Sequence, residues 1–119
     1  MGRSKINIYL ALSLISMAVI FYLSLCEIDI RTPGFSSGDK LLHMLAYGVL
    51  ACLIYMALKE AGVARSRALA LAFASSFAYG LCNETLQYFL PWREADVLDM
   101  TANGVGAFFF PLVLWYRGY

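Results

Sequence analysis

The sequence predicts an all-α membrane protein, with four transmembrane helices packed in one compact bundle over residues 1–119. The first observation is the composition: 61% of the residues are hydrophobic and only 14% are charged, which is more apolar side chain than a soluble domain of this size buries. The second is that the apolar residues form four runs of about spanning length, at 6–25, 41–58, 67–90 and 100–116. Because backbone groups in lipid must be paired within their own segment, we expect each run to be a helix.

The charge and the cysteines exclude several classes of function. A net charge of +1 gives no electrostatic case for nucleic-acid binding. Cys26, Cys52 and Cys82 show neither a CxxC spacing nor a metal pattern. His43, Glu84 and Asp96 are of ligand type, but their spacing resembles no known zinc motif, so we expect no metal, and we expect no cofactor. Cys52 lies in the middle of an apolar run and is interpreted as a small core residue. A bridge between Cys26 and Cys82 is left open.

The first run, at 6–25, follows Arg3 and Lys5 and is longer than the apolar core of a cleaved signal peptide. We therefore expect it to remain as a helix. A loop is predicted at 29–40, where Pro33, Gly34 and Gly38 break the pattern. A short turn around Gly62 is predicted at 59–66, and the last connection at 91–98.

The distribution of Lys and Arg predicts the orientation of the bundle. Six of these residues lie at the termini or in the middle connection, and three lie in the other two connections. Because cytoplasmic segments carry the excess of Lys and Arg, both termini are expected in the cytoplasm. The six are Arg3, Lys5, Lys59, Arg65, Arg67 and Arg117, and the three are Arg31, Lys40 and Arg93.

Small residues recur every four positions along the third run, and the series ends on a carboxylate. The stripe is Ala68, Ala72, Ser76 and Gly80, and the same spacing continues to Glu84. Small residues allow another helix to approach closely. We therefore expect Glu84 on the packed face of its helix, where an intramembrane carboxylate is a candidate for function.

Polar side chains form similar stripes on three of the predicted helices. The second and fourth helices begin at the end of the bundle where the third helix finishes, so all three stripes are expected at that end, which the predicted orientation makes the outer one. The stripes are Asp39, Lys40, His43 and Tyr47 on the second helix; Asn83, Glu84 and Gln87 on the third; and Asp96, Asp99 and Asn103 on the fourth.

These residue types are suited to binding an anion or to acid–base chemistry. His43 with Glu84 or Asp96 supplies a general acid and base. Lys40 and Arg93 supply cations for a phosphate, as do the helix N-termini at that end. At the height of lipid headgroups, a lipid phosphate or a lipid-linked envelope precursor is the natural ligand.

Each residue also has a structural alternative. Glu84 can be a buried carboxylate paired with Lys40 or Arg93, and His43 a packing histidine. Asp39 and Asp96 can cap their helices, and Asn103 can hydrogen-bond to another helix. The three stripes meeting at one end favour a site over this alternative.

At these residues the sequence resembles the VanZ-like family, named for an accessory teicoplanin-resistance protein. The resemblance covers about residues 36–107. Asn83 departs from the family pattern, which often has an acid before the glutamate. The resemblance implies a small multi-pass protein of the bacterial cytoplasmic membrane, connected with the cell envelope and with glycopeptide tolerance. The matching residues are Asp39-Lys40-Leu41-Leu42-His43, Tyr47, Asn83-Glu84, Gln87, Arg93, Asp96, Asp99, Asn103-Gly104 and Gly106.

Three functions remain open. The first is binding of an anionic envelope lipid or lipid-linked precursor by Asp39, Lys40, Tyr47, Asn83, Gln87, Arg93, Asp99 and Asn103. The second is hydrolysis or transfer at a lipid-linked phosphate or acyl group, with His43, Glu84 and Asp96 as catalytic residues. The third is docking of another membrane protein on the small-residue stripe, which also makes a homo-oligomer plausible.

Overall fold

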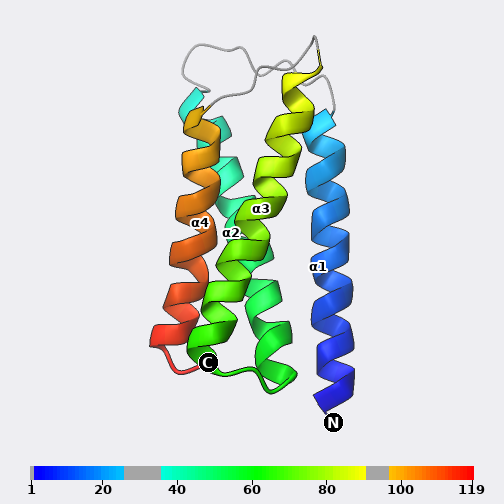
Figure 1. Ribbon diagram of the computed structural model, residues 1–119, viewed down its shortest axis with the longest axis vertical. Helices are drawn as coiled ribbons and strands as arrows, with labels where there is room; N and C mark the ends of the chain where they lie inside the picture. Colours follow the sequence, from blue (N-terminus) through cyan, green and yellow to red (C-terminus); the bar gives the residue numbers. More distant parts are fainter. Residues whose placement is uncertain (1, 26–35, 91–96) are drawn as a thin grey trace.

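The computed structural model describes residues 2–25, 36–90 and 97–119, which form four helices in up-and-down order (Figure 1). Helix α1 spans Gly2–Leu25, α2 Ser36–Glu60, α3 Arg65–Tyr88 and α4 Val97–Tyr116. The start of α1 and the end of α4 lie at the same end of the bundle (Figure 1). The prediction of an all-α bundle is confirmed.

Among the described helices, three are long and apolar enough to cross a membrane: α1, α2 and α4. Helix α3 is 24 residues long, as is α1. Its hydropathy is lower than that of α1, because it carries Arg65, Arg67 and a row of buried polar side chains. By length α3 reaches about 36 Å at 1.5 Å per residue, enough to cross a hydrocarbon core of about 30 Å. That α3 is the fourth transmembrane span stays a prediction, because its length is sufficient but its hydropathy is low.

Helix α2 lies at the centre of the bundle and packs against each of the other three helices, most extensively against α4. It begins at Ser36, so the predicted loop is wrong for residues 36–40, which form the first turns of the helix. Serine suits a helix start, and one glycine costs a helix only about 1 kcal/mol relative to alanine. Gly38 therefore does not break α2.

The turn around Gly62 is confirmed and has a specific geometry. Gly62 has a φ of 89°, which places it in the left-handed region that favours glycine. Its N–H donates to the carbonyl of Lys59 at 3.0 Å, and the Val63 N–H donates to the carbonyl of Leu58 at 3.0 Å. This pair of bonds is a Schellman C-cap, which ends α2. Helix α3 begins three residues after Gly62 and ends at Tyr88, two residues earlier than predicted.

The end of the bundle that carries the α2–α3 turn is tied to the last residues of the chain. The Tyr55 hydroxyl donates to the carbonyl of Tyr119 at 2.6 Å. The Arg65 guanidinium donates to the carbonyl of Trp115 and lies 5.3 Å from the centre of its ring. Apolar packing continues beneath these contacts, where Ala68 and Ala72 of α3 are fully buried. This end is therefore built from packing and aromatic contacts, and the candidate site lies at the other end.

Candidate functional site

The three polar stripes lie at one end of the bundle, as predicted. Helices α2 and α4 begin there, and α1 and α3 finish there (Figure 1). We name the six buried residues of the stripes the polar cluster. They are Tyr47, Asn83, Glu84, Gln87, Asp99 and Asn103, each between 1% and 7% exposed.

The buried face of α3 follows the predicted stripe. Its buried residues are Ala68, Ala72, Ser76, Gly80, Asn83, Glu84 and Gln87. The prediction that Glu84 lies on the packed face is confirmed, because its side chain is only 2% exposed. Asn83 and Gln87 share that face, so the polar end of α3 is directed into the bundle.

Tyr47 of α2 joins the second stripe to the third. Its hydroxyl accepts a hydrogen bond from Asn83 Nδ2 at 3.0 Å. Its backbone carbonyl accepts another from Ser76 Oγ at 2.9 Å. The half-buried His43, one turn nearer the polar end, stacks on the Tyr47 ring with centroids 6.5 Å apart and planes 11° apart. These contacts fix the Tyr47 ring in position between α2 and α3.

Gly80 allows α2, α3 and α4 to meet at one point. A Cβ atom at Gly80 would lie 3.0 Å from Asn103 Nδ2 of α4 and 3.2 Å from Cε1 of Tyr47. Asn103 is 1% exposed, and its Oδ1 has no hydrogen-bond partner in the described part of the chain. Such an oxygen is costly to bury in a membrane protein.

Sequence reasoning did not identify the contribution of α1. Gln87 Nε2 donates to the carbonyl of Ser24 at 3.0 Å, and the Tyr79 hydroxyl donates to the carbonyl of Met17. Both bonds end on backbone atoms of α1, which leave no trace in the side-chain pattern. The two donors could have been found, because Tyr79 and Gln87 are eight residues apart and therefore share one side of α3.

The innermost members of the cluster on α3 and α4 lie about one and a half turns inside these helices. Asn103 is six residues after the start of α4 and Asn83 five before the end of α3, which gives depths of about 9 Å and about 8 Å. Asp99, in the first turn of α4, is 7% exposed. The stripes therefore reach from the end of the bundle to a buried layer.

The remaining predicted site residues are only partly described. Arg93 and Asp96 lie outside the described residues, as does Cys26. Asp39 and Lys40 belong to the first turns of α2. Cys82 is an exposed free thiol on α3. The pairing of His43 with Glu84 or Asp96 as acid and base stays a prediction.

The chemistry of the described site is that of hydrogen bonding. Within residues 2–25, 36–90 and 97–119, no group of three His, Cys, Asp or Glu side chains is placed to hold a metal ion. The cluster instead combines three amides, a phenol and two carboxyl groups in a low-exposure layer. Such a layer can accept and donate several hydrogen bonds in fixed directions.

A bundle of four helices, three of them long and apolar, with a polar cluster at one end, defines a class of small helical proteins suited to a membrane. A family model agrees with this class: VanZ/LLP1 matches residues 6–116. The chain belongs to the VanZ/LLP1 family. Comparisons with curated proteins and with solved structures find no match.

Proposed function

We propose that this chain is a multi-pass protein of the bacterial cytoplasmic membrane whose polar end faces outward and binds the headgroup of an anionic envelope lipid or lipid-linked precursor. The observation that carries the proposal is the polar cluster, which three helices contribute to one layer near one end of the bundle. Polar groups at such a depth are costly in a membrane and mark sites of function by default.

The position of the cluster supports a headgroup as the ligand. The cluster extends from Gln87 and Asp99, near the ends of α3 and α4, to Asn83 and Asn103, about 8 to 9 Å inside these helices. This places it just below the region where phosphates and sugars of lipids reside. His43 is half-buried between the cluster and the start of α2. A headgroup that enters from the end of the bundle would meet His43 first and the amides beneath it second.

The preference for an anion rests on Lys40 and Arg93. The helix dipoles contribute little, because the C-terminal ends of α1 and α3 offset the N-terminal ends of α2 and α4 at the same level. For an anion to bind, its attraction to Lys40 and Arg93 then has to exceed its repulsion by the carboxyl groups of Glu84 and Asp99. A phosphate at this end would accept charge-assisted hydrogen bonds from both cations.

Glycopeptide tolerance is the physiological role that we propose for this binding. A protein that holds the headgroup of a lipid-linked envelope precursor competes with any antibiotic that recognises the same molecule. Membership of the VanZ/LLP1 family supports this proposal through the resemblance described above, since the VanZ-like family is named for an accessory teicoplanin-resistance protein.

The test is the lipid preference of the purified protein, measured by native mass spectrometry with phosphatidylglycerol and phosphatidylcholine of identical chains. We expect the wild type to retain phosphatidylglycerol, and Lys40→Gln to lower that preference about fivefold, as one charge near a surface contributes about 1 kcal/mol. Lys59→Gln is the matched control, because Lys59 lies in the last turn of the same helix. Equal preferences in all three proteins would refute the anionic site.

A second measurement separates binding from catalysis. The lipids of cells that lack the protein, express it, or express Glu84→Gln at matched levels are compared. Unchanged lipids with altered teicoplanin tolerance support binding. A lipid that accumulates without the protein, and that Glu84→Gln fails to clear, would instead establish the hydrolase or transferase alternative.

A further inference from the structure

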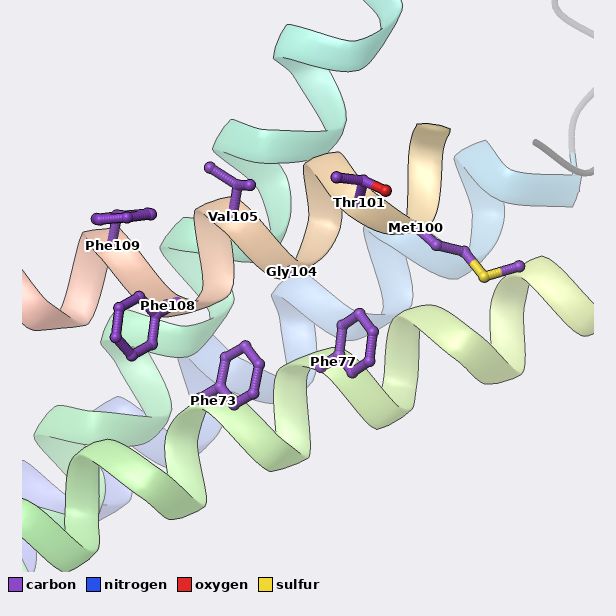
Figure 2. Close-up of a pocket in the computed structure, with 8 residues that line it drawn as sticks. All are labelled: Phe73, Phe77, Met100, Thr101, Gly104, Val105, Phe108 and Phe109. Carbon is purple, nitrogen blue, oxygen red and sulfur yellow. The ribbon is translucent and has the colours of Figure 1, made fainter. Parts of the chain in front are cut away.

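A second feature lies on the outer side of helices α3 and α4, away from the interior of the bundle. There the two helices enclose an open groove with a volume of about 390 Å³ (Figure 2). Its floor is Gly104, since a Cβ atom at that position would lie 3.2 Å from the Phe77 ring. The volume falls within the range of about 300–1,000 Å³ that small-molecule sites occupy.

The lining of the groove is aromatic and carries no charge. Phe73 and Phe77 of α3 stack with centroids 5.6 Å apart, and Phe108 of α4 meets Phe73 edge to face at 5.8 Å. Met100 and Val105 complete the sides, and the Thr101 hydroxyl is the polar group at one end. Figure 2 shows this aromatic row between the two helices. A charged or strongly polar ligand would find no partner along it.

The lining also excludes a second helix as the natural occupant. Helices pack in membranes through small residues that bring backbones together. Here bulky side chains hold a neighbour away, because Val105 is 36% exposed and Phe109 53% exposed. A thin flexible chain can enter between such side chains where a helix cannot.

The length of the groove matches one leaflet. Its residues on α4 run from Met100 to Phe109, which corresponds to about 14 Å at 1.5 Å per residue. Half of a hydrocarbon core of about 30 Å is about 15 Å. The end of the groove at Met100 and Thr101 lies beside Asp99, which belongs to the polar cluster. The groove therefore begins at the level of the proposed headgroup and follows the membrane normal from there.

We propose that this groove holds one hydrocarbon chain of the lipid whose headgroup binds at the polar end. This inference rests on the proposed function and narrows its ligand to an amphiphile with a long chain. Apolar side chains gain no hydrophobic driving force against lipid, so the groove selects a chain only when the headgroup anchors it. Chain and headgroup together would then distinguish a lipid-linked precursor from a free phosphate.

The experiment is photo-crosslinking in nanodiscs with phosphatidylglycerol that carries a diazirine in one acyl chain, followed by peptide mass spectrometry. We expect the α3 and α4 peptides that line the groove to be labelled about fivefold more than α1, equivalent to about 1 kcal/mol. The exposed surface of α1 around Ile15 and Val19 is the internal control, because these side chains are 58% and 50% exposed. Equal labelling of α1 and the groove would overturn the inference.

Two variants of α4 form a matched pair. Val105→Trp fills the groove and is expected to remove the excess labelling. Val113→Trp places the same side chain at a residue that is 56% exposed and outside the lining, and it should leave the labelling unchanged. If Val105→Trp is labelled like the wild type, the chain lies elsewhere and the inference is wrong.

The same probe with a phosphatidylcholine headgroup separates the two proposals. If both probes label the groove strongly and equally, the groove holds a chain and the anionic headgroup site fails. If phosphatidylglycerol is retained in a Lys40-dependent way while groove and α1 are labelled equally, the headgroup site stands and the groove inference fails.

Discussion

Tyr47 connects α2 to α3 through two groups at once, its hydroxyl and its backbone carbonyl. In water each bond would exchange with solvent and contribute little net stability. Inside a bundle that crosses a membrane, the unfolded alternative leaves fewer partners, and measured values average about 0.6 kcal/mol with a maximum near 1.7 kcal/mol. The bond from Asn83 to the Tyr47 hydroxyl should lie in that range, because both residues are at most 3% exposed.

Removing the hydrogen bond between Asn83 and the Tyr47 hydroxyl should lower the free energy of unfolding. Tyr47→Phe should destabilise the protein by about 1 kcal/mol, since the Asn83 amide loses its acceptor. The double variant with Asn83→Leu should be less destabilised than the sum of the single variants, which gives a coupling energy of about 0.6–1.7 kcal/mol. Unfolding in mixed detergent micelles measures each value.

Tyr88→Phe is the matched control for this cycle. Tyr88 lies on the same bundle end but is 74% exposed, so the loss of its hydroxyl should leave stability unchanged. Additive effects of Tyr47→Phe and Asn83→Leu would contradict the hydrogen bond.

Two glycines lie where α2 and α4 approach each other closely, Gly48 on α2 and Gly106 on α4. A Cβ atom at Gly106 of α4 would collide with the backbone carbonyl of Met44 in α2. A Cβ atom at Gly48 of α2 would instead collide with the ring of Phe110 in α4. A ring can rotate or shift, whereas a helix backbone moves only if the whole helix moves.

Because of this difference, the same substitution should lower stability more at Gly106 than at Gly48. Gly106→Ala should destabilise the bundle by more than the ~1–3 kcal/mol typical of overpacking, because α2 and α4 must separate along their interface. Gly48→Ala should stay within that range. Thermal unfolding in one detergent ranks the two variants, and Ala78→Gly on the exposed side of α3 serves as the control for helix propensity. Equal stability of Gly106→Ala and Gly48→Ala would mean that the two helices are not packed as described.

The elements also show what the sequence pattern predicts and what it does not. Four helices and the buried face of α3 follow from apolar length and from the spacing of Ala68, Ala72, Ser76 and Gly80. The start of α2 does not, because Gly38 and the breakers Pro33 and Gly34 before it predict a loop that continues to Lys40. The bonds from α3 to α1 end on carbonyls of Met17 and Ser24, and backbone acceptors are present in every helix of every sequence. Contacts of this kind become visible only once the helices are placed.

For the whole molecule, the number of spans and the position of the termini are linked. Among the described helices, length and hydropathy together select three that are suited to spanning, and an odd number of spans would put the two ends of the chain on opposite sides of the membrane. The bundle brings the start of α1 and the end of α4 to the same end (Figure 1), so we predict that α3 crosses the membrane as well. The polar side chains of α3 do not oppose this, because Asn83, Glu84 and Gln87 are buried against other helices and are shielded from lipid.

The topology prediction follows from an even number of spans and from the distribution of Lys and Arg. Both termini should be cytoplasmic, so a green fluorescent protein fused after Tyr119 should fluoresce, and a periplasm-dependent alkaline phosphatase fused there should be inactive. The same phosphatase fused after Leu25 should be active, since one span then precedes it. An active phosphatase after Tyr119 together with an active fusion after Leu25 would show that α3 does not cross. The polar stripe of α3 would then lie at a different level from those of α2 and α4, and the headgroup site built from all three helices would fall with it.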